Sequence, residues 1–149
     1  MMGLVWSLLG ILSGMVIALQ GPINAQLARA LGSPIAATAV SFVAGTMVLT
    51  VITLATVQAQ GLSIAWRAPP AWMLFTGGCL GAIFVTCALI LTPKLGVAAT
   101  MAFIVSGQLL AGLMLDRLGY FDLAVRELTV GRLAGAVLLV IGALLIRVY

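Results

Sequence analysis

The stretch Gln20-Gly21-Pro22-Ile23-Asn24-Ala25-Gln26 decides how the rest of the chain is interpreted. It lies in the second half of an apolar segment that begins near Leu4. Because proline removes a helical hydrogen bond and clashes with the preceding turn, Gly21 and Pro22 predict a helix break. Within a bilayer, freed backbone groups and buried amides persist only against protein or a water-filled cavity. We therefore expect the amides of this stretch to line a cavity between helices. The alternative is a proline kink that only shapes packing.

The composition excludes an ordinary soluble domain. The 149 residues are 64% hydrophobic and 7% charged, with a mean hydropathy of +1.31, whereas soluble domains are about 25% charged. We therefore expect an all-α, polytopic membrane protein. Cys79 and Cys87 lie too far apart on one apolar segment to form a disulfide. The net charge of +4 rests on seven scattered basic residues, so no nucleic-acid partner is expected.

Apolar segments of membrane-crossing length recur along the chain. At about 1.5 Å per residue, a helix needs about 20 residues to cross a hydrocarbon core of about 30 Å. The sequence predicts one transmembrane domain over residues 1–149, with an interfacial loop at 116–130 that holds all three acidic residues. The five transmembrane helices are expected at about 4–30, 35–57, 71–91, 97–115 and 131–148.

One stripe of the first predicted helix gathers polar and aromatic side chains. On a helical wheel of about 100° per residue, Ser13 lies about 20° from Gln20, and Trp6 and Asn24 lie about 40° from it. With polar residues of the second and fourth helices, the predicted substrate-binding residues are Trp6, Ser13, Gln20, Asn24, Ser41 and Gln108. An amide inside a bundle is also often an interhelical contact worth about 0.6 kcal/mol. For Gln108 both interpretations stay open.

Small residues predict where helices approach one another closely. Pairs of glycines four residues apart lie in three of the segments, and this spacing is typical of close helix packing in membranes. The predicted packing residues are Gly10, Gly14, Gly77, Gly81, Gly131 and Gly135.

The predicted helices contain no carboxylate and no lysine. Ionisable groups within the membrane are the usual proton relays and counter-ions, so recognition of a lipophilic cation is disfavoured. Amides and hydroxyls donate and accept hydrogen bonds, which suits a neutral, zwitterionic or anionic solute. The chain has no histidine base, no cluster of metal-ligating residues and no phosphate-binding glycine loop. We therefore expect neither an enzyme nor a bound cofactor or metal.

Basic residues are divided almost evenly between the two membrane sides. With five crossings, four lie on the side of the N-terminus and three on the other: Arg67, Arg117, Arg126 and Arg132 against Arg29, Lys94 and Arg147. Because basic-residue bias sets orientation, we expect the chain to insert both ways. It would pair as an antiparallel homodimer or with an oppositely oriented homologue, a symmetry that inverted-repeat transporters hold within one chain. The alternative is one orientation set by the three arginines at 117–132.

Five short motifs together carry a resemblance to a known family. They are Q-G-P-I-N-A-Q-L at 20–27, L-G-S-P at 31–34, S-F-V-A-G-T at 41–46, T-P-K-L-G-V-A at 92–98 and G-Q-L-L-A at 107–111. The chain resembles the YdcZ-type family of the drug/metabolite transporter (DMT) superfamily over nearly its whole length. The resemblance implies a multi-pass protein of the bacterial inner membrane, equivalent to half of a ten-helix, inverted-repeat DMT-like transporter fold. It also implies kinship with small multidrug resistance dimers. Those dimers carry a glutamate in their first helix, where this chain has no acid.

The sequence therefore predicts a small secondary transporter that exports an unidentified small molecule. It is expected to work in membrane lipid as an antiparallel, dual-topology dimer. Two alternatives stay open: a passive channel for a small solute, and a non-transporting membrane subunit.

Overall fold

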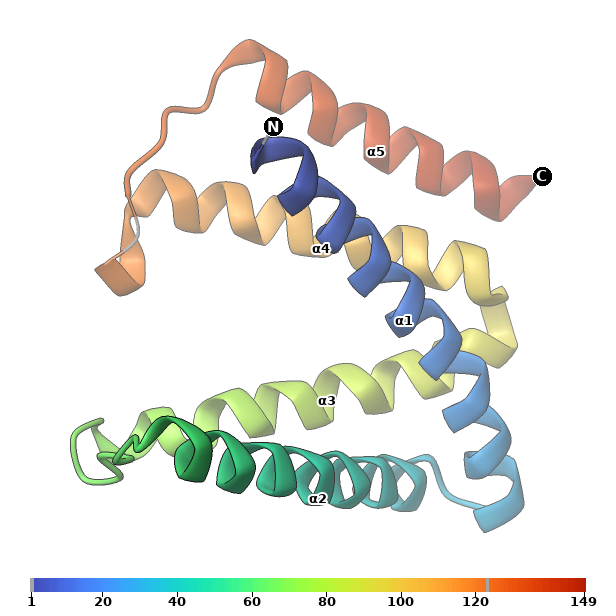
Figure 1. The fold of residues 1–149 in the computed structure, drawn as a ribbon. Helices are drawn as coiled ribbons and strands as arrows, with labels where there is room; N and C mark the ends of the chain where they lie inside the picture. The colour runs from blue at the N-terminus through green and yellow to red at the C-terminus, as the bar shows by residue number, and fades with distance from the viewer. Residues whose placement is uncertain (1, 123) are drawn as a thin grey trace. The chain divides into compact units, whose positions relative to one another are not determined.

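The computed structural model describes residues 2–122 and 124–149, and this part of the chain is all-α (Figure 1). Its long helices are α1 (Met2–Leu31), α2 (Pro34–Gln60), α3 (Ala71–Leu95), α4 (Val97–Leu118) and α5 (Val130–Val148), with a short 3-10 helix, η1 (Tyr120–Asp122). All five long helices have the length and apolar composition needed to cross a membrane. The predicted all-α class with five transmembrane-length helices is confirmed.

Local sequence signals set the turn between α1 and α2. Gly32 has a φ of 68° and follows the last residue of α1, a left-handed position that glycine occupies without Cβ strain. The Ser33 hydroxyl accepts a hydrogen bond from the N–H of Ala36 at 3.2 Å and caps α2. Pro34 takes the first helical position, where its missing N–H removes no bond. The turn thus follows from the local preferences of these three residues.

Three helices run further than predicted. α2 continues to Gln60, α3 to Leu95 and α4 to Leu118. α3 passes through Pro93 and ends at Leu95, because the next residue, Gly96, has a φ of 81° that takes the backbone out of helical geometry. The connection expected at 116–130 therefore starts only after α4 ends at Leu118.

α1 is continuous through Gly21 and Pro22. The predicted helix break is therefore wrong, although Pro22 still has no N–H to donate to the carbonyl of Ala18. Helix propagation is cooperative, and the complete turns on both sides of the proline outweigh one missing hydrogen bond. Asn24 consequently lies on an uninterrupted helix.

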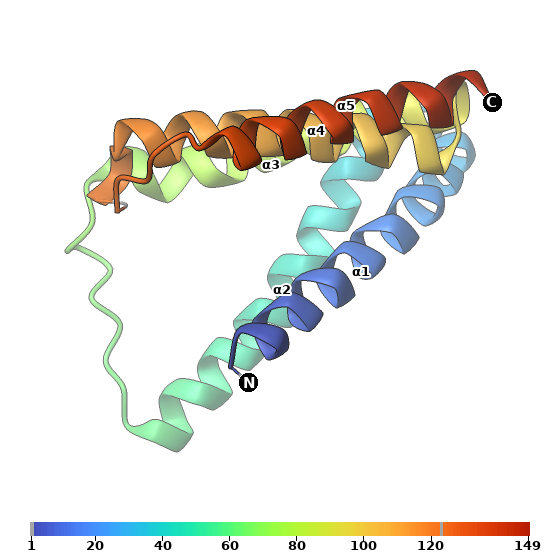
Figure 2. The same ribbon diagram turned by 90° about the horizontal axis from the view of Figure 1, so that it is seen from above.

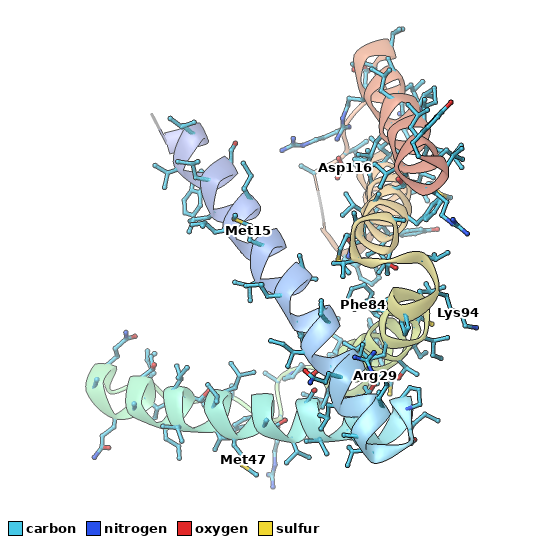
Figure 3. The ribbon with its side chains drawn as sticks, turned by 90° about the vertical axis from the view of Figure 1, so that its right-hand side faces the viewer. Met15, Arg29, Met47, Phe84, Lys94 and Asp116 are labelled. Carbon is cyan, nitrogen blue, oxygen red and sulfur yellow. The ribbon has the colours of Figure 1, made fainter. Side chains whose placement is uncertain are left out.

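The chain forms two compact units, Met1–Ile90 and Leu91–Tyr149. In the first unit, α1 packs on α2 close to the turn that joins them, and Figure 3 shows the two helices diverging from there, with Met15 and Met47 on their separate arms. In the second unit, α4 and α5 run antiparallel and pack side by side (Figures 1 and 2). The single transmembrane domain expected from the sequence stays a prediction.

The core of the first unit lies where α1, α2 and α3 meet. Four buried apolar residues and two partly buried neighbours form this core: Ala28, Ala37, Val85, Leu89, Leu27 and Phe84. One turn further along α2, the Phe42 ring packs against Gly81 of α3, so closely that a Cβ on Gly81 would lie 3.2 Å from Cζ of Phe42. We call this meeting point the three-helix junction, defined by Gly21–Ala28 of α1, Ala37–Phe42 of α2 and Gly81–Leu89 of α3.

Candidate functional site

A buried amide lies in the three-helix junction. Asn24 is 5% exposed, and its Oδ1 accepts a hydrogen bond from the Ser41 hydroxyl of α2 at 2.7 Å. Its Nδ2 is buried and has no hydrogen-bond partner among the described residues. A buried donor without a partner is costly, so this atom distinguishes Asn24 from an ordinary interhelical contact.

A second polar contact in the junction joins α2 to α3. The hydroxyls of Thr38 and Thr86 lie 3.1 Å apart, and Thr38 also donates to the carbonyl of Pro34 at 3.0 Å. Thr38 and Ser41 are three residues apart, so they lie on neighbouring turns of one face of α2. Asn24, Ser41, Thr38 and Thr86 therefore form a polar cluster that spans the three helices.

Helical spacing places Asn24 in the packed face of α1. Gly21, Asn24, Ala25 and Ala28 are buried, and their spacing of three and four residues is that of one helix face. The small side chains of this face allow α2 to approach. Arg29, in the last turn of the same helix, is exposed.

The other predicted residues of α1 lie outside the junction. Trp6 is 64% exposed, and the exposed Ser13 hydroxyl donates to the carbonyl of Leu9 in its own helix at 2.8 Å. Gln20 is exposed, and its side-chain amide bonds no residue in the part of the chain that the structure describes. The structure thus brings Asn24 and Ser41 together and leaves Trp6, Ser13 and Gln20 on the exposed arm.

Gln108 belongs to the second unit. It lies midway along α4, is exposed, and likewise bonds no described residue through its amide. The buried positions of α4 include Ala99, Ser106 and Leu113, which repeat every seven residues and exclude Gln108. Its expected place in a shared substrate path stays a prediction.

The predicted packing glycines differ in their surroundings. Gly81 is in contact with Phe42, whereas a Cβ at any of the other five positions would meet nothing within 4 Å. Close helix contact at Gly10, Gly14, Gly77, Gly131 and Gly135 is thus not found within the described chain. These five glycines remain candidates for contact with another chain.

A hollow of the described structure lies elsewhere in the first unit. It has a volume of about 540 Å³ and lies between the second half of α2 and the loop after it, from Thr46 to Trp66. Thr46 and Thr50 donate their hydroxyl hydrogens to carbonyls of their own helix at 2.8 Å, as threonine in apolar helices often does. The hollow is therefore apolar in character, and none of the predicted site residues lines it.

An ion pair closes the hairpin of α4 and α5. Nη2 of Arg132 pairs with Oδ2 of Asp116, and Nη1 donates to the carbonyl of Glu127 at 3.3 Å. The N–H of Arg126 donates to the carbonyl of Asp116 at 2.8 Å. These bonds hold the loop before α5 against the end of α4. Within residues 2–122 and 124–149, no group of three metal-ligating side chains is found.

Sequence reasoning missed Thr38 and Thr86. Threonines are frequent in α2 and most bond back to their own helix, so nothing in the sequence separates Thr38 from Thr46 or Thr50. The three-residue spacing between Thr38 and Ser41 was the available signal. The partner on α3 depends on how two helices pack and has no local signature.

Comparison with known proteins decides the family. The family described as "Putative inner membrane exporter, YdcZ" matches residues 5–145. The chain belongs to the YdcZ family of drug/metabolite transporters. The resemblance drawn from the five motifs is thus confirmed, and the polar cluster of Asn24, Ser41, Thr38 and Thr86 lies within the matched residues.

One YdcZ relative gives the degree of similarity. "Inner membrane protein YdcZ" of Escherichia coli (strain K12) is 39% identical over 75 residues. The match covers 50% of this chain and 50% of the length of that relative. No solved structure matches the chain. The YdcZ family is one of transporters rather than enzymes, and this chain is a multi-pass inner membrane protein with five candidate spans.

Proposed function

We propose that this protein is a secondary transporter that exports a neutral, zwitterionic or anionic solute and works as an antiparallel, dual-topology dimer. The observation that carries the proposal is the pair of exposed amides, Gln20 and Gln108, whose side chains bond nothing in the described chain. In hydrocarbon, an unpartnered amide costs several kcal/mol. These amides therefore need water, a solute or another subunit beside them, as the walls of a transport path would have.

The depth of Gln108 supports this argument. α4 spans Val97–Leu118 and has Gln108 at its middle, so in a crossing helix the amide lies near the bilayer centre, beyond the reach of snorkelling to the interface. Gln20 lies eleven residues from the end of α1 at Leu31, about 16 Å at 1.5 Å per residue. Both amides are thus remote from the ends of their helices.

The dimer is supported by two further features. The glycines of α1 at 10 and 14 and those of α5 at 131 and 135 have open space around them, and small residues allow close approach of a second set of helices. The division of basic residues, four against three, favours insertion in both orientations. Two oppositely oriented copies would bring both amide-bearing helices of each copy to one path, with rocking of the copies giving alternating access.

Flux into proteoliposomes tests the transport function. We expect labelled amino acids or organic anions to enter with saturation and to exchange against unlabelled solute on the far side. Gln108→Leu should lower this flux at least tenfold, since it removes the amide without adding volume. Linear flux without exchange would indicate a passive channel. No flux of any solute tested would indicate a non-transporting subunit.

Cysteine labelling tests the dimer. In a chain with Cys79 and Cys87 replaced by alanine, single cysteines at Ser33 and Arg67 report opposite membrane sides. We expect an impermeant maleimide applied to whole cells to label both positions to similar extents. Labelling of one position alone would contradict the dual topology and leave the transport function standing.

A further inference from the structure

We propose that Nδ2 of Asn24 binds an acceptor oxygen of the transported solute, a carboxylate or carbonyl oxygen, at the three-helix junction. This inference rests on the proposed function and narrows its substrate class. It follows from counting the hydrogen-bond donors of the polar cluster, which comprises Asn24, Ser41, Thr38 and Thr86.

Every hydroxyl hydrogen in the cluster is already committed. Ser41 donates its hydrogen to Oδ1 of Asn24, and Thr38 donates its hydrogen to the carbonyl of Pro34. Because a hydroxyl has a single hydrogen, the contact between Thr38 and Thr86 requires Thr86 to be the donor. Of the four side chains, only Asn24 keeps unused N–H groups.

The unused donor selects the chemistry of the ligand. Nδ2 carries two N–H groups and is buried without a partner, so a group that binds it gains a hydrogen bond and relieves an unpaired donor. Carboxylate and carbonyl oxygens accept such bonds. An ammonium has donors only and therefore forms no hydrogen bond with Nδ2. The unpaired Nδ2 therefore favours an acceptor over an amine without a charged side chain.

The position of Asn24 at the edge of the packing gives the ligand room. One turn beyond Ser41, a Cβ on Gly45 would meet nothing within 4 Å, and Gln20, one turn before Asn24 on α1, is exposed. α1 and α2 diverge on this side of the junction (Figure 3). A small separation of α1 from α2 at their last contact is enough to admit an acceptor group to Nδ2.

The test uses three probes that share a four-carbon skeleton and differ in the terminal group: butyrate, butyramide and butylamine. Thermal unfolding of the purified full-length protein in lipid nanodiscs measures binding. We expect butyrate and butyramide to raise the melting temperature and butylamine at neutral pH to leave it unchanged. Asn24→Leu should weaken the apparent Kd for butyrate about tenfold or more, the effect of losing a hydrogen bond to a charged group.

A matched control separates the site from a general loss of an amide. Gln58 is an exposed amide in the last turn of α2, and Gln58→Leu should keep the response to butyrate. If Asn24→Leu does not fold, the double variant Asn24→Leu/Ser41→Ala removes both partners of the bond and leaves no orphaned hydroxyl. The same loss of response is expected from it.

Two outcomes would overturn the inference. Stabilisation by butylamine equal to or above that by butyrate would mean that Oδ1, not Nδ2, faces the ligand. An unchanged response to butyrate in the Asn24 variants, or no response to any probe, would place solute binding elsewhere. Saturable exchange in proteoliposomes alongside either result would leave the proposed function intact, whereas probe binding without flux would contradict that function and support this site.

Discussion

The two helix pairs of this protein are built in different ways. α1 is buried only over Gly21–Ala28, at one end, whereas α4 has buried residues from Ala99 to Leu113 along most of its length. α1 and α2 meet through a polar contact with one donor left unpaired. The hairpin of α4 and α5 meets through alanines such as Ala136 and Ala143 and is closed by an ion pair. A pair that is packed throughout provides a scaffold, while a pair joined at one end has surface and polar groups left for other contacts.

The largest effect on stability is expected from filling the junction. Ala37 of α2 is 0% exposed, and Ala37→Leu adds three carbons where no space exists, at a cost of about 1–3 kcal/mol. The exposed Ala44 of the same helix provides the control, since Ala44→Leu should leave stability nearly unchanged. Unfolding in mixed micelles measures both. Equal stability of the two variants would mean that the end-only packing of α1 and α2 is looser than described.

The second effect comes from the bond between α2 and α3. Thr38→Val keeps the shape of the side chain but removes the acceptor of the Thr86 hydroxyl, and the loss of a hydrogen bond of this kind costs about 1 kcal/mol. Thr100 of α4 is 0% exposed, and its hydroxyl donates to the carbonyl of Gly96, the residue that precedes the same helix. Thr100→Val should therefore cost less. If the Thr100 variant is the less stable one, the polar cluster contributes nothing to the junction.

A third effect separates a packed glycine from an open one on α3. Gly81→Ala places a methyl group 3.2 Å from Cζ of Phe42, whereas Gly78→Ala meets nothing within 4 Å. Replacing an unstrained helical glycine by alanine stabilises by about 0.5–1 kcal/mol. We expect Gly78→Ala to raise the free energy of unfolding by this amount and Gly81→Ala to give no such increase. Equal gains in the unfolding free energy would show that the Phe42 ring moves away freely.

The smallest effect is expected in the hairpin. Asp116→Asn removes the ion pair with Arg132. The side chain of Arg132 is 30% exposed and that of Asp116 is 31% exposed. Exposed pairs of this kind contribute about 0.2–1 kcal/mol, and the apolar seam of α4 and α5 remains. A loss above this range on unfolding would mean that the ion pair, rather than the seam, holds the hairpin together.

The sequence predicts periodic and local features of this fold well. Apolar length alone predicts the five helices, and Gly32, Ser33 and Pro34 predict the turn between α1 and α2 because their preferences are local. Pro22 shows the limit of local rules. Its effect depends on the turns around it, and the helix continues through it.

The sequence identified individual residues of the candidate site but not the contacts between helices. The stripe on α1 identified Asn24, and Ser41 was named on its polarity, but nothing in the sequence indicated that they bond each other. That contact depends on the approach of α1 to α2, which is set by tertiary packing. The orphaned Nδ2 follows from the same packing and has no signature in the sequence.

The one-ended attachment of α1 has a mechanical consequence. Residues 3–20 of α1 are exposed except for a half-buried Ala18, so the helix is a lever whose pivot lies beside Asn24. At about 1.5 Å per residue its free arm is about 27 Å long, and a tilt of about 10° at the pivot moves the far tip by about 5 Å. A displacement too small to disturb the core at Ala28 and Ala37 is thereby amplified at the opposite membrane face.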